Sequence, residues 1–164
     1  MKRIKLSFLA IFAVIASALM LSACSTPADY CENVMGKCTK LEKDVNKLAD
    51  QIASKDIDKI QTVYNENLAE INETIDYLQK IGACNNQEYL QKAALNFAQT
   101  YKDIYENEYA TAIDILKKDK KTFEDGDKIA FMFDDVEAKS NEAKIDLLNN
   151  FKKFIQEFEL TVAQ

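Results

Sequence analysis

The segment CENVMGKCTKLEKDVNKLADQI, residues 31–52, decides the fold. Its apolar side chains recur at alternating intervals of three and four residues, and they are Cys31, Val34, Cys38, Leu41, Val45, Leu48 and Ile52. Because an α-helix turns once every ~3.6 residues, this spacing places them all on one face and leaves the charged residues on the other. The pattern is sustained over three heptads, which predicts a long amphipathic helix that packs against other helices.

Three stretches downstream show the same helical spacing. The second stripe consists of Ile57, Ile60, Tyr64, Leu68, Ile71, Ile75 and Leu78, and it ends at Ile81 and Gly82. The third consists of Leu90, Ala94, Phe97, Tyr101, Ile104, Ala112 and Ile115, and the last of Ile129, Phe133, Val136, Ala143, Leu147, Phe151, Phe154 and Phe158. Polar joints at 54–56, 83–87 and 117–127 separate the stripes, and Asp56 is expected to cap the second helix.

These patterns predict one all-α domain over residues 30–164. Helices joined by short loops become antiparallel neighbours, so we expect an up-down-up-down four-helix bundle. Three long helices, with the first two stripes fused, are the alternative. Composition agrees with long helices and few loops, because the 164 residues include only 3 Gly and 1 Pro.

The N-terminal residues have the order of a secretory signal peptide. Lys2, Arg3 and Lys5 precede an apolar run over 6–21. The next small residues lead to Cys24, and the segment Leu21-Ser22-Ala23-Cys24 resembles the lipobox of bacterial lipoproteins. The alternatives are an uncleaved membrane anchor, for which the apolar run is slightly short, and simple secretion.

The lipobox resemblance implies that residues 1–23 are removed and that Cys24 carries acyl chains. Residues 24–29 would then tether the bundle to the membrane, and Ser25 after the cysteine implies the outer membrane, with a periplasmic or surface-exposed body. Residues 88–116 and 149–160 resemble the small helical-bundle envelope lipoproteins of Bacteroidota and spirochaetes. That resemblance brings no catalytic residues with it.

Net charge and composition exclude several classes of partner and of catalytic or metal site. Removal of residues 1–23, which carry three basic residues and no acidic residue, changes the net charge from −6 to −9. Such a balance argues against nucleic acid as a partner and against docking of the body onto anionic lipid. The chain has no His, which excludes His-based catalytic triads and His-ligated metal or haem. We therefore expect no enzyme, cofactor or metal site, but a membrane-anchored binding or structural module with an unknown protein partner.

The cysteines after Cys24 are expected to have separate roles. Cys31 and Cys38 are one heptad apart, or ~10.5 Å along a helix axis, and a disulfide needs Cα atoms about 4.4–6.8 Å apart. Folding the first two helices antiparallel brings Cys84 nearer to Cys31 than to Cys38. We therefore predict a Cys31–Cys84 disulfide with Cys38 packed in the core. The alternative is that all three are reduced and packed.

Two stretches are candidate binding sites. Tyr101, Tyr105 and Tyr109 stand four residues apart on one side of the third helix, which suits a partner-binding face or, alternatively, the edge of the core. The acidic segment 124–137 suggests an alternative function, an envelope carrier or sensor of a cation or small ligand. That segment breaks the order of an EF-hand loop, so a turn at Asp125–Gly126 with Asp127 capping the last helix is the simpler interpretation.

Overall fold

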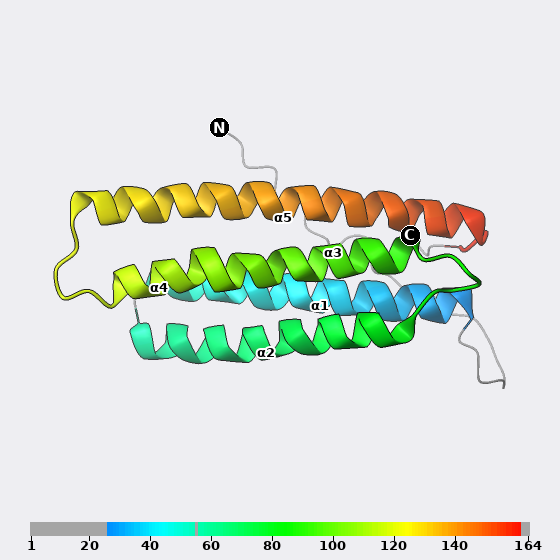
Figure 1. Cartoon of the computed structure of the whole chain (residues 1–164), viewed down its shortest axis with the longest axis horizontal. Helices are drawn as coiled ribbons and strands as arrows, with labels where there is room; N and C mark the ends of the chain where they lie inside the picture. The colour runs from blue at the N-terminus through cyan, green and yellow to red at the C-terminus, as the bar shows by residue number, and fades with distance from the viewer. Residues whose placement is uncertain (1–25, 55, 162–164) are drawn as a thin grey trace.

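The protein is an antiparallel bundle of four long helical rods (Figure 1). The computed structural model describes residues 26–54 and 56–161, so Cys24 and the lipobox-like segment lie outside the described residues. The first two rods are α1 (Pro27–Ser54) and α2 (Ile57–Ile81). The third rod combines α3 (Tyr89–Ile104), the π-helix η2 (Tyr105–Tyr109) and α4 (Ala110–Leu116), and the fourth is α5 (Phe123–Glu157). The predicted four-helix bundle is confirmed, and the separate α1 and α2 exclude the three-helix alternative.

The core consists of the predicted apolar stripes. The largest fully buried side chains come from all four rods, and they are Met35, Leu41, Leu48, Ile60, Ile71, Leu78, Leu90, Phe97, Ile104, Tyr105, Leu147 and Phe154. The two halves of α5 differ, however. Ala143, Leu147, Phe151 and Phe154 in its second half are buried, whereas the stripe residues of its first half are only half-buried.

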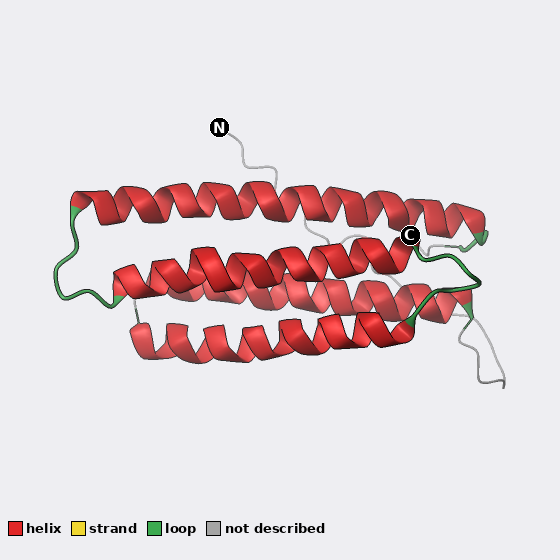
Figure 2. Ribbon diagram, viewed as in Figure 1, coloured by secondary structure: helices red, strands yellow, loops and turns green. Residues whose placement is uncertain are grey.

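The third rod lies between α5 and the α1–α2 pair, and Figure 2 shows α5 along one side of the bundle. Direct links between α1 and α5 include the stacked rings of Tyr30 and Phe154, 5.7 Å apart, and the ion pair of Glu42 with Lys144. At its N-terminal end, α5 extends past the ends of α2 and α4 (Figure 1). The first half of α5 therefore has neighbours on fewer sides than the second half.

The helix ends explain how the joints are made. Asp56 accepts a hydrogen bond from the backbone N–H of Lys59 at 3.3 Å, which confirms the predicted cap of α2.

At the start of α5, the predicted turn at Asp125–Gly126 and the predicted cap at Asp127 are wrong. Thr122 Oγ1 accepts from the N–H of Asp125 at 3.2 Å, and Asp125 Oδ2 accepts from the N–H of Thr122 at 2.9 Å. This reciprocal capping box satisfies both donors, so the helix begins at Phe123 and includes Gly126 and Asp127.

Candidate functional site

A π-helix interrupts the third rod. It covers Tyr105–Tyr109, between the α-helical segments α3 and α4. Tyr105, Glu108 and Tyr109 are all buried within this single turn. A regular amphipathic pattern would place an acidic residue on the solvent face, so the burial of Glu108 is the distinctive feature here. Single π-turns within α-helices are frequent at functional sites.

Two hydrogen bonds from Asn67 link Tyr105 in the third rod to α2 and α1. Asn67 Nδ2 in α2 donates to Tyr105 Oη at 2.6 Å and to the backbone carbonyl of Asp44 in α1, also at 2.6 Å. The ring of Tyr105 also stacks on Tyr64, with centroids 5.5 Å apart, and meets Tyr109 edge-on. Burial raises the pKa of Tyr105, and it raises the pKa of Tyr109 to about 12, so both hydroxyls stay protonated at neutral pH.

The predicted tyrosine face lies inside the bundle. Tyr101, Tyr105 and Tyr109 are 4%, 0% and 3% exposed, respectively. The ring of Tyr105 contacts that of Tyr109, and the ring centroid of Tyr101 lies 4.7 Å from that of Phe97. Burial thus favours the alternative of core packing and leaves no open ring face for a partner.

Glu108 forms the buried side of a carboxylate–ammonium–carboxylate arrangement. Its side chain is 10% exposed, and Lys139 Nζ lies 2.6 Å from Glu108 Oε1 and 2.7 Å from Asp135 Oδ2. Hydrogen bonds to Asp135 and then Glu108 raise the pKa of Lys139, while the bond from Lys139 lowers the pKa of Asp135. Lys139 is therefore held as an ammonium ion between two carboxylates. The other oxygen, Glu108 Oε2, is buried without a hydrogen-bond partner.

Glu108 also lines an open depression of about 500 Å³ on the surface between the third rod and α5. We call this the acidic depression, and its lining consists of Glu108, Glu124, Asp127, Lys128, Phe131, Met132 and Asp135. Phe131 is 74% exposed, and Phe123, eight residues earlier in α5, is 85% exposed. Residues Phe123, Asp127, Phe131, Asp135 and Lys139 are each four apart in α5, so aromatic and acidic side chains alternate along one side of that helix.

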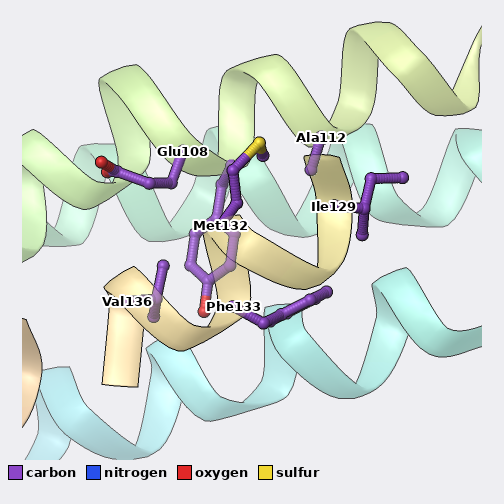
Figure 3. A pocket seen from close by; sticks show the side chains of 7 residues that line it. Glu108, Ala112, Ile129, Met132, Phe133 and Val136 are labelled. Atoms are coloured by element: carbon purple, nitrogen blue, oxygen red, sulfur yellow. The ribbon is translucent and has the colours of Figure 1, made fainter. Parts of the chain in front are cut away.

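The wall next to the acidic depression is closed by apolar packing. Figure 3 shows Glu108 and Ala112 facing Ile129, Met132, Phe133 and Val136 of α5, with the Glu108 carboxylate directed away from Ala112. Tyr109 completes this contact, with its ring centroid 6.4 Å from that of Phe133. No room for a water molecule remains inside this contact. The acidic depression is therefore a surface feature and does not lead into the core.

The acidic residues of segment 124–137 have two kinds of position: one caps the start of α5, and others lie on the surface. Asp125 serves the capping box, and hydrogen bonds from Lys118 and from the Thr122 backbone lower its pKa to about 2. Glu124, Asp127 and Asp135 line the acidic depression. Within residues 26–54 and 56–161, no three Asp, Glu or Cys side chains are grouped as metal ligands.

Cys31, Cys38 and Cys84 are buried free thiols in this structure. The predicted Cys31–Cys84 bond is thus not formed here. Cys84 follows the end of α2 that lies beside the start of α1, where Cys31 is located (Figure 1). Burial raises the pKa of Cys31 to about 12, and the nearby Cys84 raises it as well. Burial alone raises the pKa of Cys38 to about 12. The Cys31–Cys84 pairing therefore stays a prediction about the oxidised protein.

Sequence reasoning identified the acidic segment of α5 but missed Glu108. Glu108 lies three residues after Tyr105 and four before Ala112, on the buried side of the rod, but a search for apolar residues alone passes over an acidic residue at such a position. Among the described residues, no helix is both long and apolar enough to span a bilayer.

Comparison of the chain with protein-family models, curated proteins and solved structures gave no match. Function is therefore inferred from the residues and their geometry.

Proposed function

We propose that this chain is a non-enzymatic, lipid-anchored binding protein of the bacterial cell envelope, attached to the outer membrane through Cys24. The basic, apolar and small residues that precede Cys24, in that order, support the anchor. Several acyl chains on one cysteine would hold the protein firmly, whereas a single chain binds a membrane only marginally. The net charge of −9 after processing would keep the bundle itself away from anionic lipid.

The observation that carries the binding role is the acidic depression with its exposed aromatic rim. Large apolar side chains that gather on one surface and are bordered by polar residues are typical of interaction sites. Phe131 and Met132 lie together in the depression, and Phe123 extends the apolar surface along the same helix. The first half of α5, which carries these residues, is packed on fewer sides than the second half. This surface is therefore accessible.

Lipid attachment is tested with the full-length chain and its Cys24→Ala variant, expressed in a Gram-negative host with labelled palmitate. The wild-type protein should incorporate label and fractionate with the outer membrane. The variant should lose both properties, while a Cys38→Ala variant, which keeps Cys24, should retain them. Label on the Cys24→Ala protein would contradict the proposed anchor. Protease treatment of intact cells then distinguishes a surface-exposed body from a periplasmic one.

Binding at the acidic depression is tested by placing a photo-crosslinking amino acid at position 131 in cells. Position 145 is the matched control, because Ile145 is 60% exposed on the same helix but does not line the depression. We expect a discrete cross-linked product from position 131 and none from position 145. Equal products at both positions, or none at either, would contradict a binding role for this surface.

The alternative predicted from segment 124–137 is a carrier or sensor of a cation or small ligand. It would use the same depression, since Glu124, Asp127 and Asp135 of that segment line it. Calorimetry with calcium and transition metals tests it directly. The absence of heat and of any change in thermal midpoint would refute it.

A further inference from the structure

We infer that the acidic depression binds a cationic, amphipathic segment of a partner protein, with a Lys or Arg side chain paired to Glu108 and an apolar side chain on Phe131. This inference rests on the proposed function as a binding protein and names the chemistry of its partner.

Charge complementarity determines the class of partner. Four carboxylates line the depression, from Glu108, Glu124, Asp127 and Asp135, and they outnumber the two ammonium groups beside them, Lys128 in the lining and Lys139 paired to Glu108 and Asp135. A second copy of this chain would bring another acidic surface to the contact, and anionic lipid would bring phosphate groups. Both are repelled, because like charges placed together across an interface are unfavourable. A cationic partner is attracted, and electrostatic steering also raises its association rate.

Glu108 provides an independent indication of a cation. A buried acceptor without a donor is unfavourable, and more so when the group is charged. Lys139 already satisfies Oε1, which shows that an ammonium group suits this carboxylate. An incoming ammonium or guanidinium group would donate to Oε2, while Lys139 keeps its contacts with Oε1 and with Asp135. A guanidinium group would suit this site especially well, because its donors can bond two carboxylates at once.

The apolar part of the depression requires that the partner carry an apolar side chain as well as a cationic one. Phe131 and Met132 are adjacent in α5 and both line the depression, between the carboxylates of Asp127 and Asp135. A small inorganic cation would leave these apolar side chains uncovered. An amphipathic helix that carries apolar and cationic residues three or four positions apart would cover Phe131 and pair the carboxylates together.

The probe is a synthetic helical peptide of Lys and Leu with an amphipathic repeat. Titration calorimetry and ¹H–¹⁵N NMR follow its binding to the full-length protein in a non-ionic detergent, and empty micelles provide the blank. Three comparison probes are the same peptide with Glu in place of Lys, a peptide of Lys alone, and spermidine. We expect only the Lys-Leu peptide to bind strongly, to shift the amide signals of the depression and to weaken as salt is added.

Two variants change the depression and two serve as matched controls. Phe131→Ser removes an exposed ring, and Glu108→Gln removes the charge while keeping the shape. The controls are Ile145→Ser and Glu142→Gln, at exposed positions of α5 outside the depression. We expect Kd to rise roughly tenfold or more in the first pair, because Glu108→Gln removes the charge that the cation pairs with and Phe131→Ser removes the apolar surface that the partner covers. The control variants should match the wild type. Because Phe131 is exposed, its variant tests the inference even if Glu108→Gln unfolds.

Three results would overturn the inference. They are no binding of the Lys-Leu peptide, equal binding by all variants, and equally tight binding of spermidine or the Lys-only peptide at the same amide signals. The last result would assign the depression to a simple amine instead of an amphipathic segment. Any of them, combined with lipid labelling at Cys24 and cross-linking at position 131, would refute this inference while leaving the proposed function intact.

Discussion

The hydrogen bonds of Asn67 join three rods at the π-helix, so their removal should lower stability in a way that depends on Tyr105. Asn67 is 7% exposed, and its Nδ2 donates to Tyr105 Oη and to the carbonyl of Asp44. Asn67→Ala removes both bonds and leaves the buried Tyr105 hydroxyl without that donor. A buried polar group left unpaired is unfavourable by about 1–3 kcal/mol, so we expect a loss of about 2–3 kcal/mol in the free energy of unfolding.

The Tyr105→Phe variant isolates the hydroxyl. It removes one hydrogen bond but leaves Asn67 paired with Asp44, so we expect a loss of about 1 kcal/mol. In the double variant no unpaired hydroxyl remains, and its loss should be about 1 kcal/mol smaller than the sum of the single losses. The assay is urea unfolding followed by circular dichroism, with the denaturant slope compared among the variants. Additive losses, within about 0.3 kcal/mol, would refute the assignment of this bond as a coupled link.

Three further predictions concern helix composition, pH and the cysteines. Gly36 lies within α1 with open space around its Cα, so Gly36→Ala should raise the free energy of unfolding by about 0.5–1 kcal/mol in urea titrations; a loss would contradict this. The folded-state pKa of Asp125 is about 2, below its ordinary value of 3.8, so its charge stabilises the fold above pH 4 and this contribution is lost toward pH 2. The stability difference between the wild type and Asp125→Asn should therefore shrink on acidification, and a constant difference would oppose the assignment. In oxidised protein, peptide mapping should find Cys31 joined to Cys84, with Cys38 alkylated only after unfolding; any pair that contains Cys38 would refute this.

The helical architecture could be predicted because it depends on local periodicity. The stripe from Cys31 to Ile52 is buried on one face of α1, as its spacing requires. The cap at Asp56 was equally local, since a side chain needs only the next turn's N–H groups to form it. The start of α5 was predicted incorrectly, because Gly126 and several acids resemble a turn when the pairing of Thr122 with Asp125 is overlooked.

The sequence by itself determined the helices, their antiparallel order and the acidic character of segment 124–137, because these follow from spacing and composition. Only the tertiary structure decided which polar groups are buried and which apolar groups are left exposed. The fold brings Glu108 of the third rod beside Lys139 of α5, and the packing of the first half of α5 on the third rod leaves Phe131 uncovered. Both outcomes depend on contacts between residues distant in the chain, such as Glu108 and Lys139, and helical periodicity carries no information about such contacts.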